Sequence, residues 1–562
     1  MLTVIFLSSL LLSTLTMAGS KNRGRTPADS SDGCRPAEPS LYGQEAFEAT
    51  TLPVRPGKPG KQPFWNVHAP RFIYAPAFDF ATRKEAKSYH LVARSLGDSA
   101  QYTANIDQPW LSFPSLWQQL PCDSITLTAA AIGSNGEIID TVGTRTFMKS
   151  PAFNGPYHEP PYSCRESGRK SLQALLHQKR IQHWLEHEKP GNDYWGWANP
   201  AKIMGGLISG MIHYATHFPD AEDAAMAKEL ARIVADFLLT LREPEDHRLA
   251  NWPLTYWDGV SSGRHPIQPD RIKTNFVINA GMAFLDMYDA TREKGYYRAA
   301  LQIAETFEAV QNDSGTWPQM FDRETGRAAA NANQLIPTWV IMFFDRLHRD
   351  YGVTRFQTLR QRAFRWCMEK PVKTYGWYAQ FLDTPPGKRY KNMSRDEANE
   401  LAIIILKTKE ATPKQLQIAL ELLRYAEDQF VVWDQRDPVL RTRWFRKGTR
   451  FDGLEAQGSD WFVPSVLEQY KFYTPIAGSN AIMIRAYVAA CQRAGRPIYR
   501  AKAVSLANTL IRAQDYHGGV DIPTHLRRTL IDDDFIDNGI NAALVLLEYA
   551  DILTTRTGVE AK

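Results

Sequence analysis

Carboxyl groups lie beside aromatic rings in the segment DWFVPSVLEQYKFYTPIAGSNA, residues 460–481. Glu468 is flanked there by Val466 and Leu467 on one side and by Tyr470 on the other. An apolar, aromatic surround raises the pKa of a carboxyl group, so that it keeps its proton near neutral pH. Such an acid, paired with an ionised carboxylate, can cleave a glycosidic bond. Glu468 is therefore a candidate proton donor, although it could instead cap or ion-pair within a short helix.

The second carboxyl group must come from another loop. Asp383 in WYAQFLDTPPG follows a run of aromatic residues, and Asp322 and Asp258 hold similar places in QMFDRETG and LTYWDG. Asp also favours turns, which explains the recurrence without any chemistry. We expect Asp383 to be the partner of Glu468.

Aromatic and polar side chains in the same loops could hold a sugar, with rings stacked on its C–H face. The candidate substrate-binding residues of this kind are Trp195, Trp197, Asp193, Asn392, Trp377 and Tyr473. Packing between helices would explain the tryptophans equally well. Asn392 also precedes a helix, where Ser394 and Glu397 have the spacing of a capping box.

Positive charge gathers in LRTRWFRKGTR, just before the opening segment. Arginine binds carboxylates through two parallel hydrogen bonds, so Arg443 and Arg446 would suit a uronic acid. A solvated surface is the alternative. With these arginines and Asn392, Tyr470 could act as the base of a lyase, which removes a proton beside the uronate.

Helical periodicity dominates the chain from residue 165 to 562. Amphipathic segments such as AMAKELARIVADFLLTL and YRAALQIAETFEAVQ each follow another helical pattern. Loops marked by Trp252, Trp317, Trp377 and Trp433 recur about every 60 residues, whereas a TPR-like solenoid would repeat about every 34. The pattern predicts a mainly α protein with an (α/α)6 toroid, in which an inner ring of helices is wrapped by an outer ring. In IMGGLISG, the residues Gly205, Gly206 and Gly210 are expected to permit close helix packing.

Ahead of the helices, residues 63–152 alternate apolar and polar positions between turn signals such as GSNGE. This predicts a small β-sandwich similar in pattern to a fibronectin type III module. Residues 19–62 are rich in Pro, Gly and charge and predict a flexible leader. Residues 1–18 are typical of a signal peptide cleaved near Ala18, which predicts export to the periplasm or the extracellular space.

Bulk composition excludes several classes of protein. The chain has 562 residues, 44% of them hydrophobic, and a formal charge of only +5, which does not indicate a nucleic-acid partner. Its five cysteines lack CxxC spacing; a bridge such as Cys122–Cys164 is possible, but free buried thiols are favoured. The histidines show no metal-binding motif, so no metal and no cofactor are expected. The apolar run at the start of the chain is too short to span a membrane, and the sequence shows no other candidate span.

The segments PFWNVHAPRFIYAPAFDF, WFVPSVLEQYKFYTPI and RYAEDQFVVW resemble those of exported bacterial proteins related to six-hairpin glycosidases. Within that group the chain resembles glycoside hydrolase family 154, which includes β-glucuronidases acting on side chains of plant polysaccharides. The resemblance covers most of the chain after residue 60. It implies the toroidal fold and a glucuronic-acid-containing substrate.

Three hypotheses follow. The preferred one is an exported glycoside hydrolase that cleaves uronic-acid-containing glycans, with Glu468 and Asp383 as its carboxyl pair. A polysaccharide lyase using Tyr470 is the first alternative. A non-catalytic glycan-binding protein is the second.

Overall fold

The computed structural model describes residues 40–56, 58, 64–97, 100–261, 267–380, 384, 386–441, 460–529 and 535–554. The predicted signal peptide and much of the predicted leader lie outside these ranges. Residues 40–56 differ from the expected flexible leader, because helix α1 (Gly43–Ala49) forms there. The segment is also tied to the helical body, since Arg55 Nη2 lies 2.7 Å from Glu421 Oε1.

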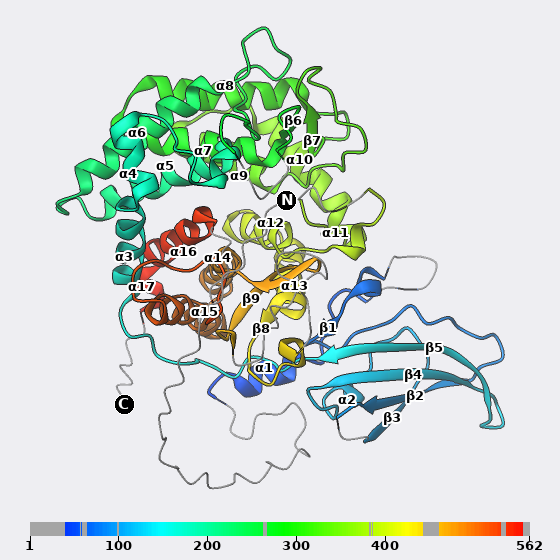
Figure 1. Ribbon diagram of the computed structural model, residues 1–562. Coiled ribbons are helices and arrows are strands. Elements are labelled where there is room, and N and C mark those ends of the chain that lie inside the picture. Colours follow the sequence, from blue (N-terminus) through cyan, green and yellow to red (C-terminus); the bar gives the residue numbers. More distant parts are fainter. Residues whose placement is uncertain are drawn as a thin grey trace, which may run out of the picture.

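Among the described residues, six helices contact one another in cyclic order and close a ring (Figure 1). They are α5 (Pro200–His217), α7 (Thr274–Thr291), α9 (Thr338–Tyr351), α12 (Asp396–Lys407), α14 (Ala477–Ala494) and α16 (Ile536–Glu548). A second set packs outside, each helix mainly on one ring helix: α6 (Ala224–Thr240), α8 (Lys294–Val310), α10 (Gln357–Glu369), α13 (Pro413–Phe430), α15 (Pro497–Tyr516) and α3 (Cys164–Leu176). The chain is mainly α, and its helices are arranged as the toroid pattern predicts.

Local sequence explains how these helices start and how closely they pack. Thr412 and Gln415 form a complete capping box at the start of α13, with Pro413 at the first helical position. A Cβ atom on Gly205 of α5 would lie 3.0 Å from the backbone of Asn279 in α7, and one on Gly210 would lie 2.9 Å from Ile540 of α16. These two glycines therefore permit close helix packing, as expected. Gly206 faces only ordinary contact at 3.5 Å.

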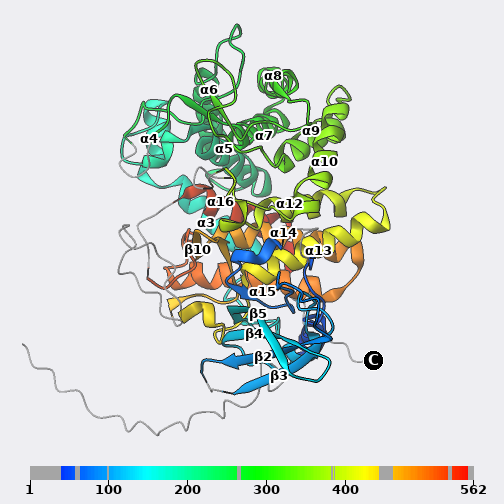
Figure 2. The same ribbon diagram turned by 90° about the vertical axis from the view of Figure 1, so that its right-hand side faces the viewer.

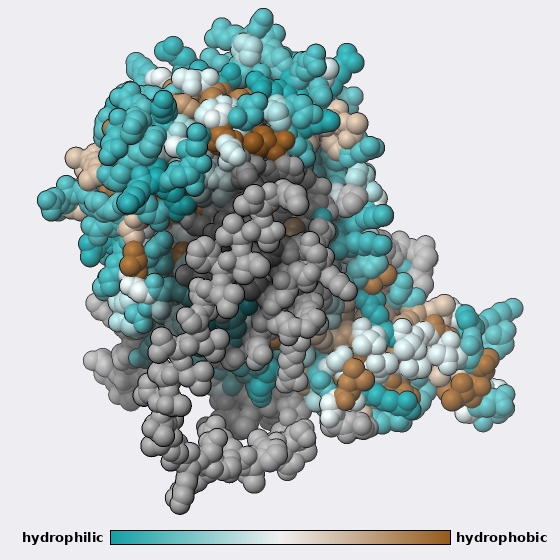
Figure 3. All heavy atoms as spheres, viewed as in Figure 1, coloured by the Kyte–Doolittle hydropathy of each residue, from teal (hydrophilic) through white to brown (hydrophobic). Residues whose placement is uncertain are grey.

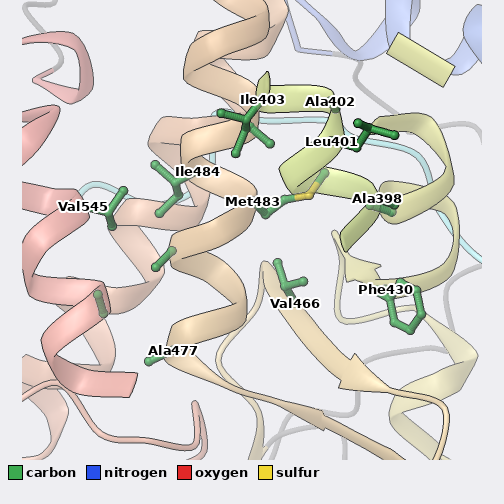
Figure 4. Close-up of a cluster of buried hydrophobic side chains, with 14 of the residues drawn as sticks. Ala398, Leu401, Ala402, Ile403, Phe430, Val466, Ala477, Met483, Ile484 and Val545 are labelled. Carbon is green, nitrogen blue, oxygen red and sulfur yellow. The ribbon is translucent and has the colours of Figure 1, made fainter. Parts of the chain in front are cut away.

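The ring is filled by apolar side chains from neighbouring helices. Figure 4 shows Met483 and Ile484 of α14 between Ala398 and Leu401 of α12 on one side and Val545 of α16 on the other. All five side chains are buried. This packing joins half of the ring into one core, so the polar groups at the helix ends are held on a rigid frame.

The predicted β-sandwich is a single sheet. Its strands are β1 (Arg71–Phe72), β2 (Ser88–Ser95), β3 (Gln101–Ile106), β4 (Ser124–Ile132) and β5 (Ile138–Lys149), in the order β1-β5-β4-β2-β3. Only β1 and β5 pair in parallel. The GSNGE hairpin turn forms as predicted, with Gly136 at φ 84°. Alternation correctly predicted strands with one buried face, but it does not specify what covers that face. In the described residues α2 (Pro114–Trp117) helps to cover it, and Trp117 Nε1 donates to the Ile73 carbonyl at 3.0 Å.

The sheet lies against the half of the toroid that contains α13 (Figure 2). Arg71 of β1 and Asp437 of the helical body form an ion pair of 2.7 Å in which both side chains are fully buried. Asp428 Oδ1 accepts hydrogen bonds from the backbone N–H groups of Ile73 and Tyr74 at 2.6 and 2.8 Å. The contact between the two parts therefore includes buried polar bonds as well as apolar packing.

Shorter elements complete the described chain. They are α4 (Lys179–His187), α11 (Pro371–Thr374), α17 (Ala550–Leu553), η1 (Trp65–His68), η2 (Trp195–Ala198), η3 (Arg389–Lys391), η4 (Pro438–Arg441), β6 (Arg271–Lys273), β7 (Met320–Asp322), β8 (Val431–Val432), β9 (Ser465–Gln469) and β10 (Phe472–Pro475). None of the helices in the described ranges is long and apolar enough to cross a membrane.

The cysteines differ from the sequence expectation at one position. Cys122 is disulfide-bonded, whereas Cys164, Cys367 and Cys491 are free. The possible Cys122–Cys164 bridge is therefore wrong, since Cys164 lies buried as a free thiol in helix α3.

Candidate functional site

Of the predicted carboxyl pair, only Glu468 lies among the described residues. Glu468 lies half-buried on strand β9, and its backbone carbonyl accepts a hydrogen bond from Arg395 Nη1. Asp383, Arg443 and Arg446 lie outside the described residues. Asp322, an alternative partner, accepts bonds from the N–H and hydroxyl of Thr325 at 3.0 and 2.8 Å, which is the turn role that Asp commonly takes.

Both predicted tyrosines are buried and bonded to one residue of α13. Tyr470 donates to Gln429 Oε1 at 2.7 Å, and Tyr473 donates to the Gln429 carbonyl. Burial raises the pKa of Tyr470 well above its ordinary value, and neighbouring tyrosine and aspartate groups add to the rise. A phenol in this environment is a poor base, so these contacts favour a structural role.

The structure places the predicted sugar platforms Trp197 and Trp377 in the core. Both side chains are fully buried, and Trp197 packs edge-on against Trp184 with ring centroids 5.4 Å apart. A buried ring has no face to offer a ligand. Trp195 is also buried, with its ring against Phe535 at 4.6 Å, whereas Asp193 is exposed.

Asn392 joins two loops. Its Nδ2 donates to Thr384 Oγ1 at 2.9 Å, and its Oδ1 accepts from the backbone N–H of Lys471 at 3.0 Å. The expected capping box is not formed, because α12 begins at Asp396 and Arg395 is its N-cap. Ser394 Oγ accepts instead from the Asp396 N–H at 3.2 Å. Glu397 is therefore not used as a cap.

The structure brings together a carboxyl cluster that sequence reasoning missed, formed by Asp396, Glu397 and Glu400 at the start of ring helix α12. Residues three and four apart share a helix face, so Glu400 lies one turn beyond both other acids. Glu400 Oε2 accepts from the Thr338 hydroxyl at 2.5 Å, and Oε1 accepts from Trp339 Nε1. Acidic residues opening a helix that is otherwise apolar on every side, RDEANELAIIIL, were the available signal.

Positive charge borders this carboxyl cluster. Arg395 is buried, its Nη2 lies 3.1 Å from Asp396 Oδ1, and the same nitrogen donates to Ser479 Oγ of α14 at 2.6 Å. Lys202 of α5 lies 3.2 Å from Asp537 of α16 and lowers the pKa of Asp396 through its charge. Helices α5 and α12 lie opposite each other in the ring, so the ring helices present these groups at one common end.

A second lysine stands beside Lys202. The Nζ atoms of Lys202 and Lys273 lie 5.6 and 4.2 Å from the centroid of the Phe276 ring, at the start of α7. We call these two lysines the basic wall of the site; Lys273 is buried, and Lys202 also faces Asp537 at 3.2 Å. The site thus has acids at the N-terminus of α12, one lysine near the N-terminus of α5 and a second lysine on β6, directly before α7.

Burial raises the pKa of all three acids, and the neighbouring charges differ from one acid to the next. It raises the pKa of Glu397 well above its ordinary value, and the charges of Asp396 and Glu400 raise it further. Burial raises the pKa of Glu400 to about 8. Asp396 is also raised by burial, but Arg395, Ser394 and Lys202 oppose the rise. Asp396 is thus the member best able to ionise, while Glu397 retains its proton.

Two buried carboxyl oxygens of the cluster, Asp396 Oδ1 and Glu397 Oε2, have no hydrogen-bond partner among the described residues, and Asp396 Oδ1 faces Arg395. An unpartnered buried carboxyl oxygen is costly in a merely structural position. Elsewhere in the described ranges, as at this site, no three His, Cys, Asp or Glu side chains are arranged to hold a metal ion.

Comparison with known proteins finds likeness in structure only. No family model matches the chain, and no curated protein matches it. A family 76 glycoside hydrolase from a bovine Bacteroides thetaiotaomicron strain aligns over 83% of this chain and 93% of its own, with 11% identity and a TM-score of 0.46. Cellobiose 2-epimerase from Spirochaeta thermophila aligns over 68% and 96%, with 12% identity and a TM-score of 0.47.

A third similar structure is the unsaturated glucuronyl hydrolase from Streptococcus agalactiae, which aligns over 70% of this chain and 94% of its own, with 8% identity and a TM-score of 0.43. Because each TM-score is below 0.5, none of these likenesses bears on what this chain binds or does.

Proposed function

We propose that the protein is a glycoside hydrolase whose active centre is the carboxyl cluster of α12. Glu397 is the general acid that protonates the leaving oxygen. Asp396 is the ionised carboxylate that activates water or attacks the anomeric carbon. The observation that carries this proposal is the pair of neighbouring buried carboxyl groups: burial raises the pKa of both, nearby acids raise that of Glu397 further, and Arg395, Ser394 and Lys202 oppose the rise at Asp396.

Glu400 and Arg395 support this pair. Glu400 is held by Thr338 and Trp339, and its charge helps Glu397 to keep its proton. Arg395 stabilises the Asp396 carboxylate. It also bonds the backbone carbonyl of Glu468, which the sequence predicts as the proton donor; with Glu397 in that role, Glu468 is instead a second candidate for the ionised partner.

The preferred substrate is a glycan that contains a uronic acid. Lys202 and Lys273 supply positive charge at the same end of the ring as the carboxyl cluster, and a cation attracts the carboxylate of such a sugar. The sequence resemblance to the β-glucuronidase-containing family supports the same class. The apolar, signal-like start of the chain supports export.

The alternatives have less support. A lyase that uses Tyr470 needs a phenol able to lose its proton, yet burial raises the pKa of Tyr470. In a glycan-binding protein without activity, burial of coupled carboxyl groups would cost free energy and serve no chemical step.

The test is incubation with a panel of uronic-acid-containing glycans, with reducing ends and near-ultraviolet absorbance read together. New reducing ends without absorbance, lost in Glu397→Gln, support the hydrolase. Loss in Glu468→Gln with retention in Asp396→Asn would transfer the role of the ionised partner to Glu468. Absorbance that rises with the reducing ends would contradict hydrolysis and indicate a lyase.

A further inference from the structure

A cavity of about 360 Å³ lies among three loops, separate from the carboxyl cluster. We call it the rim pocket, and its lining residues are Glu243, His247, Pro269, Asp270, Arg323 and Glu324. The loops follow α6, precede α7 and follow β7. They belong to the side of the ring on which α7 begins, so the rim pocket lies toward the same end as the carboxyl cluster.

The rim pocket is built on an ion pair between a buried glutamate and a partly exposed arginine. Glu243 is 6% exposed, and its Oε1 accepts from Arg323 Nε at 2.5 Å. The Arg323 backbone N–H donates to the Asp270 carbonyl at 2.8 Å, which joins two of the loops. The Arg323 side chain remains 37% exposed, so part of the guanidinium can meet a ligand.

Backbone groups contact both ring nitrogens of His247, and its Nδ1 also lies 3.9 Å from Glu243 Oε2. Its Nδ1 accepts from the backbone N–H of Leu249 at 3.1 Å, and Nε2 lies 3.4 Å from the Glu324 carbonyl. The bond at Nδ1 leaves the ring proton on Nε2. The pocket thus offers N–H donors from His247 and Arg323 beside carboxylate acceptors from Asp270 and Glu324.

The donors and acceptors of the rim pocket indicate which class of ligand it could bind. Paired donors and acceptors on a shallow surface match the neighbouring hydroxyl groups of a sugar. Three carboxyl groups face one arginine here, and Asp270 is further engaged with Arg271 at 3.1 Å. The pocket therefore disfavours a uronate and suits a neutral sugar.

The distance of the rim pocket from the basic wall indicates which part of a glycan the pocket could bind. Strand β6 runs directly from the pocket residue Asp270 to Lys273, and three extended residues span about 10 Å. The rim pocket therefore lies beyond the basic wall, where a further residue of a glycan held at the carboxyl cluster could bind.

We propose that the rim pocket is a distal subsite that binds a neutral sugar of an extended glycan, so that the enzyme acts on a chain with neutral residues beyond its uronic acid. The proposal rests on the proposed hydrolase function. It is independent of which carboxyl group is the ionised partner.

The test compares a short substrate, 4-nitrophenyl β-glucuronide, with a long one, a glucuronic-acid-containing oligosaccharide that has a neutral backbone. The variants are Asp270→Ala and Glu324→Ala, both at exposed positions. Glu245→Ala is the control, since it lies in the same loop as Glu243 and is exposed but does not line the pocket.

Loss of a sugar hydrogen bond to a charged group should lower kcat/KM for the long substrate about tenfold, mainly through KM, and leave the short substrate unchanged. The control should match wild type on both. Equal kcat/KM of wild type and the pocket variants on the long substrate would overturn the subsite.

Failure of the proposed function would be distinguishable, because wild type would then cleave neither substrate. The rim pocket is judged in that case by electrophoresis through gels that contain the polysaccharide parent of the oligosaccharide. Retardation of wild type that is lost in Glu324→Ala supports the binding site, whereas equal migration of the two overturns it.

Discussion

At the scale of single residues, the site depends on a proton held by Glu397. We expect Glu397→Gln to lower kcat by at least about a hundredfold, since a positioned general acid contributes that much or more. Glutamine keeps the size of the side chain and removes only the proton it donates. The measurement is kcat on the active glycan, with circular dichroism to check folding. Activity within a few fold of wild type would remove Glu397 from the mechanism.

The pH dependence of kcat/KM tests the role of Glu400. Its negative charge raises the pKa of Glu397, so Glu400→Gln should move the alkaline limb of the kcat/KM profile to lower pH. The protonated acid is needed, and its activity is lost as the pH rises through its pKa. An alkaline limb that stays in place would show that the two groups are not coupled.

The same residue affects stability. Its pKa rises from 4.5 to about 8 on folding, so the native chain holds more protons than the unfolded chain between these values. Stability therefore falls as the pH rises through that window. In Glu400→Gln the thermal midpoint should depend less on pH from about 5 to 8, which scanning calorimetry measures. An unchanged slope would contradict the shift.

At the scale of elements, the crossing of α5 and α7 depends on one glycine. Ala at Gly205 would press on the backbone of Asn279 at 3.0 Å, and we expect a loss of about 1–3 kcal/mol in the free energy of unfolding. Gly206→Ala is the matched control, because its Cβ has room at 3.5 Å and the substitution favours helix by about 1 kcal/mol. Denaturant unfolding compares them. Equal effects would mean that the ring adjusts freely at this crossing.

At the scale of the whole molecule, the sheet and the toroid are joined by the buried pair of Arg71 and Asp437. Removing one partner leaves a buried charge, so Asp437→Ala should cost about 3–5 kcal/mol. The pair of Arg83 and Asp140 has the same length, 2.7 Å, but is exposed, so Asp140→Ala should cost about 0–1 kcal/mol. Thermal unfolding of both variants checks this difference. Similar midpoints would show that the interface tolerates the lone charge.

The hydropathy of the surface does not indicate where the site lies. In the view of Figure 3, the face over helices α4 to α8 is covered mainly by hydrophilic side chains. A charged, mixed surface keeps a large protein soluble but does not locate a site. The carboxyl cluster is found only by following the ring helices to their N-terminal ends.

The sequence by itself determined the helices, their pairing and the repeat, because periods of 3.6 and 2 residues follow from the local geometry of helices and strands. The turn at Gly136 was likewise predicted from neighbouring residues. The sequence also predicted close packing at Gly205.

Only the tertiary structure decided which polar and aromatic groups meet. Trp377 looked like a sugar platform and is core, and Ser394 with Glu397 looked like a capping box and is not. Asp396 and Lys202 are far apart in sequence, yet closure of the ring brings their charges into range. Burial and long-range contact set protonation, and neither is encoded in the spacing of neighbouring residues.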